Sequence, residues 1–216
     1  MTRGRLVMLG DSCVAIQFEN AIDPVVNARC VALARSLAGL AIRGVRDVVP
    51  TYNAVTIQFD PRVADRRALR EEVSALAAAA APTADGGARL MEVPVDYGGA
   101  AGPDLAAVAA FARCSEADVV RLHGATPYRV YMLGFLPGFA YMGPVDARIA
   151  MPRLETPRLR VAAGSVGIAG AQTGIYPCDA PGGWRIIGRT DLVLFDPART
   201  EPFLLKAGDR VRFVAA

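Results

Sequence analysis

Residues suited to binding or catalysis concentrate in the second half of the chain, in segments that combine glycine with aromatic and polar side chains. Residues 134–143 carry Phe135, Phe139 and Tyr141 between glycines and a proline. Glycine and proline disfavour a helix there, so we predict a loop that brings the three rings together. Such a cluster either plugs the end of a barrel or presents an aromatic surface to a ligand or partner, and the sequence leaves both open.

A second segment, residues 170–190, combines turn glycines with polar side chains that include Gln172, Thr173, Tyr176 and Arg185. Backbone N–H groups beside glycines can approach an anion, and an arginine can hold a phosphate or carboxylate by two parallel hydrogen bonds. The alternative is that these glycines only turn the strands of a barrel.

Standard catalytic motifs are missing from the sequence. There is no Gly-x-x-x-x-Gly-Lys phosphate loop, and the Gly-x-Ser-x-Gly pattern fails at Ser165 because Ala163 stands in place of the first glycine. His123 is the only histidine, so a His-rich metal site cannot be built and we predict no metal. Lys206 is the only lysine and lies in a predicted turn, so a mechanism that needs a Schiff-base or biotin-carrying lysine has this one candidate.

The first part of the chain predicts a compact α/β unit. Helices are expected from Asp23-Pro24, where an N-cap acceptor precedes a first-turn proline, and over about residues 65–80, where apolar side chains recur at helical spacing. Residues 82–87 are small, polar and rich in helix and strand breakers, so we predict domains over 1–84 and 85–216. Four short apolar or alternating runs are typical of strands: residues 5–9, 13–18, 45–49 and 54–59.

The second part predicts mostly β-structure. A strand over 91–95 is followed by two short helices, the second opened by a Ser115-x-x-Asp118 pattern that resembles a capping box. His123 lies near the end of this helix, where the helix C-terminus would favour its cation. Short apolar runs then alternate with glycine and proline, which is typical of a β-barrel or β-sandwich: residues 128–133, 185–187, 192–195 and 210–214.

Composition excludes several classes of protein. With 53% hydrophobic and 21% charged residues the chain is not disordered. Its net charge of +3 is spread along the sequence, which gives no support to a nucleic-acid partner. No apolar run is long enough to span a membrane and no signal peptide is recognisable, so we expect a cytoplasmic protein. The four cysteines are expected to be small buried hydrophobes.

Four longer strings closely resemble the family of the 5-oxoprolinase B subunits, also called allophanate hydrolase subunit 1 or the Kip inhibitor family. The strings stand in the family's order, and the resemblance covers nearly the whole chain, including Gly10-Asp11-Ser12 near its start. They are Gly134 to Gly143, Pro152 to Arg158, Ala163 to Pro177 and Pro181 to Thr190.

This resemblance implies an α+β fold, with an N-terminal ferredoxin-like α/β domain followed by a C-terminal cyclophilin-like β-barrel. It also implies a component that works with the A and C subunits of 5-oxoprolinase to open 5-oxo-L-proline to L-glutamate, with ATP as co-substrate of the complex. We expect a site shared with the C subunit and an isolated chain without activity. The candidate catalytic residues are His123, Tyr141, Arg153 and Arg158, and the candidate substrate- or nucleotide-binding residues are Phe139, Gln172, Thr173, Tyr176 and Arg185.

Other functions remain open at this point. A regulatory protein that inhibits a sensor histidine kinase is one, since the family includes Kip inhibitors. A subunit of a urea amidolyase- or allophanate-type carboxyltransferase or hydrolase is another, although a biotin carrier would have to come from another protein. Prolyl isomerisation rests on barrel resemblance alone, which carries no site. His123 itself is either catalytic or a buried histidine with its hydrogen bonds satisfied.

Overall fold

The computed structural model describes residues 4–81 and 88–216. The chain separates into two compact units, Met1–Gly87 and Ala88–Ala216, and each is described by itself. The predicted boundary between residues 84 and 85 lies outside the described residues.

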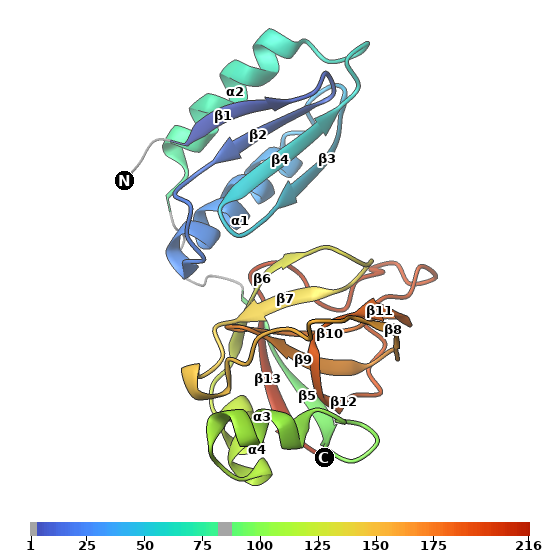
Figure 1. The fold of residues 1–216 in the computed structure, drawn as a ribbon. Coiled ribbons are helices and arrows are strands. Elements are labelled where there is room, and N and C mark those ends of the chain that lie inside the picture. The colour runs from blue at the N-terminus through green and yellow to red at the C-terminus, as the bar shows by residue number, and fades with distance from the viewer. Residues whose placement is uncertain (1–3, 82–87) are drawn as a thin grey trace. The chain divides into compact units, whose positions relative to one another are not determined.

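The N-terminal unit is an antiparallel four-stranded sheet in the order β1-β2-β4-β3 with two helices (Figure 1). Alternate residues of its strands, Val14 and Ile16 among them, are buried with Leu33 of α1 and Val73 of α2 in one apolar core. The sequence shows the same pattern: apolar residues alternate in the strands and recur every three to four residues in the helices. The elements are β1 (Arg5–Leu9), β2 (Cys13–Gln17), α1 (Pro24–Gly39), β3 (Val45–Pro50), β4 (Ala54–Phe59) and α2 (Arg66–Ala79).

Both helices of this unit begin where the sequence predicts. The carboxylate of Asp23 accepts hydrogen bonds from the backbone N–H groups of Val25 and Val26, and Pro24 occupies the first turn. Asp65 caps α2 in the same way. These caps satisfy N–H groups that have no partner inside the helix.

The C-terminal unit is a closed seven-stranded barrel in the order β10-β7-β6-β13-β5-β12-β9, completed by the pairing of β10 with β9 (Figure 1). Only β13 and β5 pair in parallel among these strands. A separate two-stranded sheet joins β8 and β11. The elements are β5 (Leu90–Tyr97), α3 (Leu105–Ala112), α4 (Glu116–Gly124), β6 (Tyr128–Leu133), β7 (Ala140–Gly143), the 3-10 turn η1 (Ala147–Ile149), β8 (Arg158–Val161), β9 (Ser165–Ala169), β10 (Gln172–Ile175), β11 (Ala180–Gly182), β12 (Arg185–Arg189) and β13 (Arg210–Ala215).

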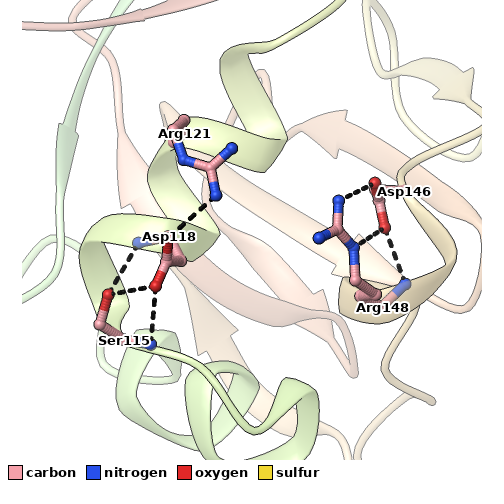
Figure 2. A network of polar contacts seen from close by, with 5 residues as sticks. All are labelled: Ser115, Asp118, Arg121, Asp146 and Arg148. Atoms are coloured by element: carbon pink, nitrogen blue, oxygen red, sulfur yellow. Dashed lines mark hydrogen bonds and ion pairs between the residues drawn. The ribbon is translucent and has the colours of Figure 1, made fainter.

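The capping box predicted for α4 is present (Figure 2). The Ser115 hydroxyl accepts a hydrogen bond from the Asp118 N–H at 3.1 Å, and the Asp118 carboxylate accepts from the Ser115 N–H at 3.3 Å. Hydrogen bonds from the Ser115 hydroxyl and from Arg121 hold the pKa of Asp118 down at about 2. Because the capping box fixes the first turn of α4, it also helps to position the later residues of this helix, including His123.

Three expectations about the barrel are wrong. Residues 134–143 are not one loop, since 140–143 form β7 and pair with both β6 and β10. Residues 192–195 form no barrel strand, and Phe195 makes only an isolated bridge with Phe203. Two of the glycines expected to lie in turns, Gly174 and Gly182, lie within β10 and β11. In the first and third cases strand pairing outweighs the local turn preference, whereas residues 192–195 pair only through the Phe195 bridge.

The cysteines are also less uniform than expected. Cys30 is buried in the N-terminal core, and burial raises the pKa of its thiol to about 12. Cys178 is exposed in the connection between β10 and β11, which corrects the expectation of four buried side chains. Cys13 and Cys114 are partly buried.

Candidate ligand-binding groove

A groove of about 300 Å³ on the barrel unit brings together four of the predicted site residues: Tyr141, Arg153, Gln172 and Tyr176. They come from β7, β10 and the chain on either side of these strands, so only barrel closure assembles them. A larger hollow in the N-terminal unit, about 750 Å³, contains none of the predicted residues. The groove is lined by Phe135, Tyr141, Arg153, Pro157, Ala169, Gln172, Tyr176, Pro181, Gly182, Gly183 and Trp184.

Phe139 lies beneath the groove as the centre of an aromatic cluster. Its ring centroid is 4.9 Å from that of Tyr141, 5.2 Å from Tyr176 and 5.3 Å from Trp184, all in edge-to-face geometry. Phe139 is itself only 1% exposed, so it supports the groove wall and does not face a ligand. Phe139 thus forms the buried centre of the cluster, and the rings around it line the groove.

Phe135 is the exposed member of this cluster, with 61% of its surface accessible. Its φ is +67°, in the left-handed region that disfavours a bulky side chain by about 1–2 kcal/mol. Backbone hydrogen bonds hold the segment, from Gly134 N–H to Phe139 carbonyl at 3.1 Å and from Phe139 N–H to Leu136 carbonyl at 3.0 Å. The chain thus presents an aromatic ring at the groove in an unfavourable backbone conformation.

Arg153 reaches the groove because two hydrogen bonds hold the backbone on either side of it. The Leu154 N–H donates to the Gly183 carbonyl at 2.8 Å, and Arg185 Nε donates to the Pro152 carbonyl at 3.1 Å. Within the part of the chain that the structure describes, no carboxylate pairs with the Arg153 guanidinium. Its charge lowers the pKa values of Tyr141 and Tyr176, although burial is the larger effect and raises both. The groove therefore has a cation beside aromatic side chains.

Arg158, predicted as catalytic, does not line the groove and instead braces its wall. Its guanidinium donates to Asp104 Oδ1 at 2.8 Å and to the Trp184 carbonyl at 3.4 Å. Asp104 Oδ2 accepts from the Ile186 N–H at 2.6 Å. Asp104 and Arg158 thus tie the start of α3 and β8 to the chain that carries Trp184.

His123 and Thr173 lie together in the barrel interior, outside the lining of the groove. Thr173 Oγ1 donates to the Gly167 carbonyl at 3.0 Å, so it accepts from His123 Nε2 at 2.8 Å, and Nδ1 then accepts from the Tyr97 hydroxyl at 2.7 Å. The His123 ring also stacks on Phe213 at 4.4 Å. Burial lowers the pKa of His123 to about 3. The helix end therefore does not favour a cation here, which corrects that expectation, because desolvation outweighs the helix dipole.

The remaining polar candidates are placed as follows. Arg185 is half-buried beside the groove and orients residue 152 instead of lining the cavity. Lys206 lies in a turn, as predicted, and pairs with Glu201 at 2.9 Å. Among the described residues, no three or more His, Cys, Asp or Glu side chains gather where a metal ion could bind, and none of the helices is long and apolar enough to cross a membrane.

Comparison with known proteins adds the family. The sequence model of the carboxyltransferase domain, subdomains C and D, matches residues 4–205. The chain belongs to this family. A relative in Escherichia coli O157:H7, named as the B subunit of 5-oxoprolinase, is 42% identical over 99% of this chain and 97% of its own length.

Solved structures agree with this assignment. The structure of TTHA0988 superposes with a TM-score of 0.85 and 38% identity over 94% of this chain, which spans only 40% of that longer chain. The urea amidolyase of K. lactis matches over 98% of this chain and 15% of its own, with a TM-score of 0.75 and 21% identity, which shows a shared fold alone. The fold of this chain, mixed α/β with a closed barrel, is thus similar to that of the matched part of each solved chain.

The candidate site residues predicted from the sequence did not include Trp184 or Asp104, and Phe135 was named only as part of the aromatic cluster in residues 134–143. Trp184 and Phe135 lie in the strings that carry the family resemblance, and this location could have identified them as candidate site residues. Asp104 had no such signal, because its partner Ile186 is 82 residues away along the chain.

The pH dependence of stability is a testable consequence of the His123 environment. The folded chain keeps His123 neutral, whereas the unfolded chain binds a proton near pH 6.5. This contribution to the free energy of unfolding is complete above pH 6.5 and falls as the pH drops towards 3, by about 1.4 kcal/mol per pH unit. We expect the barrel to lose about 2 kcal/mol between pH 7.5 and pH 5, measured by urea unfolding followed through Trp184 fluorescence.

His123→Gln is the matched control for this measurement, because its amide is neutral at every pH. Its unfolding free energy should depend less steeply on pH than that of the wild type. Equal slopes for the two proteins would contradict the assignment of a neutral buried imidazole.

Proposed function

We propose that this chain is the B subunit of an ATP-dependent 5-oxoprolinase that opens 5-oxo-L-proline to L-glutamate together with the A and C subunits. The observation that carries the proposal is the groove. It places the Arg153 guanidinium beside aromatic side chains and the Gln172 amide, and this guanidinium has no carboxylate partner among the described residues. The E. coli relative named as the B subunit of 5-oxoprolinase supports the same assignment. 5-Oxoproline is a small ring with a carboxylate and a lactam amide, so Arg153, Gln172 and the rings of Tyr141 and Trp184 offer one contact for each part.

The residues of the groove fit binding better than proton transfer. Burial raises the pKa values of Tyr141 and Tyr176, and an arginine stays protonated, so these groups do not titrate near neutral pH. A lactam carbonyl is a poor electrophile, and transfer of the ATP γ-phosphoryl group to its oxygen, with release of ADP, would let water attack the carbon. The C–N bond then breaks as the nitrogen takes up a proton, and a second water releases phosphate from the resulting acyl phosphate to leave glutamate. We assign substrate orientation to this chain and the phosphoryl and proton transfers to its partners.

A partner that completes the site is consistent with the lengths of related chains. In TTHA0988 the segment similar to this chain makes up only 40% of a longer polypeptide. A sequence with one histidine, buried in the barrel, and one lysine, paired with Glu201, has few groups of its own for this chemistry.

Reconstitution tests the proposal. The three subunits are co-expressed and ATP-dependent release of glutamate from 5-oxo-L-proline is measured, then repeated with each subunit omitted in turn. We expect the rate to fall to background without this chain. An unchanged rate in its absence would refute the proposal.

A carboxyltransferase component is the second candidate, favoured by the family description and by the fold shared with urea amidolyase. It predicts that turnover depends on a biotin-carrying protein, so avidin should abolish activity of the complex. The 5-oxoprolinase proposal predicts no effect of avidin. Inhibition of a sensor histidine kinase stays a hypothesis, to be tested by pull-down from the native host.

We also propose the finer fold names. In the N-terminal unit, β2-α1-β3-β4-α2 with sheet order β2-β4-β3 supports a ferredoxin-like arrangement in which β1 occupies the edge next to β2. The closed barrel with its two covering helices supports the cyclophilin-like description of the C-terminal unit.

A further inference from the structure

We propose that Phe135 is the residue that closes the groove over a bound ring-shaped ligand and so determines which ligands are accepted. The inference rests on the proposed function in taking the groove as the binding site of 5-oxo-L-proline. It concerns a side chain that none of the comparisons assigns a role.

The position of the ring is the first observation. Phe135 lines the groove, and its ring stands edge-on to Phe139 at 5.6 Å and to Tyr176 at 6.5 Å. Phe139 and Tyr176 are 1% exposed, Trp184 is 7% exposed and Tyr141 is partly buried, so most of the aromatic wall is already shielded from water. Phe135 alone in this cluster keeps most of its surface in solvent, and a ligand in the groove would cover it.

The backbone is the second observation. A phenylalanine at φ +67° is unfavourable, and glycine would hold the same turn without that cost. The ring gains little from burial in this position, so packing does not explain why a large side chain is placed there. Strained residues that persist at the mouth of a cavity point to ligand contact.

The segment that carries Phe135 is held on both sides. Gly134 N–H is bonded to the Phe139 carbonyl, and Gly138, with φ +87°, approaches Phe195 and the Leu194 carbonyl so closely that a Cβ would lie 2.8 Å from Phe195 Cβ. The backbone position of Phe135 is therefore set before a ligand arrives. Its side chain can contact the apolar part of a ligand whose charged group pairs with Arg153.

Phe135→Gly gives a sharp test, because it removes the ring and relieves the backbone at the same time. Trp184 is the only tryptophan and lines the groove, so its fluorescence reports ligand binding by the full chain. The probe is 5-oxo-L-proline. We expect Phe135→Gly to raise its Kd about 10-fold or more while the urea midpoint of the barrel stays the same or rises.

Two further variants make the comparison specific. Phe135→Tyr keeps the ring and should bind the probe within about 3-fold of wild type. Phe111→Ala removes another exposed phenylalanine, 48% accessible on α3 and outside the groove, and should leave the Kd unchanged.

The outcomes separate this inference from the proposed function. If the wild type and Phe135→Gly bind the probe equally, Phe135 does not close the groove, whatever the complex catalyses. If 5-oxo-L-proline leaves Trp184 fluorescence unchanged in the wild type, the inference is overturned as well, whereas glutamate release by the reconstituted complex would still support the proposed function. A lower urea midpoint together with weaker binding would assign Phe135 to stability and would also overturn it.

Discussion

Replacement of Arg153 by alanine is expected to lower kcat/KM of the reconstituted complex about 100-fold, which corresponds to about 2.7 kcal/mol. Arg153 has no carboxylate partner among the described residues and faces a groove with aromatic walls. A charged hydrogen bond between a guanidinium and a carboxylate or phosphoryl group is typically worth about 1.5–3 kcal/mol, and more when the site excludes water.

The measurement is steady-state glutamate release with 5-oxo-L-proline varied at saturating ATP. Arg153→Lys keeps the charge but loses the planar fork, so it should recover part of the loss. Arg121→Ala is the control, because Arg121 is exposed on α4 and its ion pair with Asp118 lies at the helix surface (Figure 2). It should change kcat/KM less than about 2-fold. Wild-type kinetics in a complex that carries Arg153→Ala would show that the Arg153 guanidinium does not take part in the proposed site.

Asp104→Ala is expected to destabilise the barrel by about 3 kcal/mol, because it breaks a largely buried ion pair and a backbone contact together. The side chain of Asp104 is 9% exposed and that of Arg158 is 31% exposed. Without the carboxylate, the Ile186 N–H and the Arg158 guanidinium both lose their acceptor at 2.6 Å and 2.8 Å. This value is at the lower end of the loss in unfolding free energy that is typical when a buried ion pair is broken, because Arg158 keeps access to water.

Urea unfolding followed through Trp184 fluorescence measures this loss in the unit that contains the pair. Asp191→Ala is the matched control, since Asp191 is exposed in the same unit, and it should change the free energy of unfolding by less than about 0.5 kcal/mol. A loss below about 1 kcal/mol for Asp104→Ala would mean that the Arg158 pair is not a brace of the groove wall.

Much of the N-terminal unit follows from local pattern. Asp23-Pro24 and Asp65 mark helix starts, and the alternation through 54–59 marks a strand, because capping and side-chain period act within a few residues. The Ser115 capping box is local in the same sense and was predicted for that reason.

The barrel was less predictable where its strands are short. Residues 172–175 lie in the segment expected to hold turn glycines, yet they form β10 and pair with β9. Gly167 and Gly174 lie against the aromatic cluster, where a Cβ would come within 3.1 Å of Trp184 and 3.0 Å of Phe139. Small residues are used there for close packing, which a local turn preference does not distinguish from a turn.

The sequence by itself determined the family, because the four motif strings carry it, and these strings contain every residue that lines the groove. The division into domains over 1–84 and 85–216 stays a prediction. Only the tertiary structure decided the roles within that set. It placed Arg153 at the groove and Arg158 beneath its wall, although both stand in one string. It also buried His123 as a neutral ring and exposed Phe135. Burial and the approach of distant strands set these roles, and neither can be read from the spacing of residues along the chain.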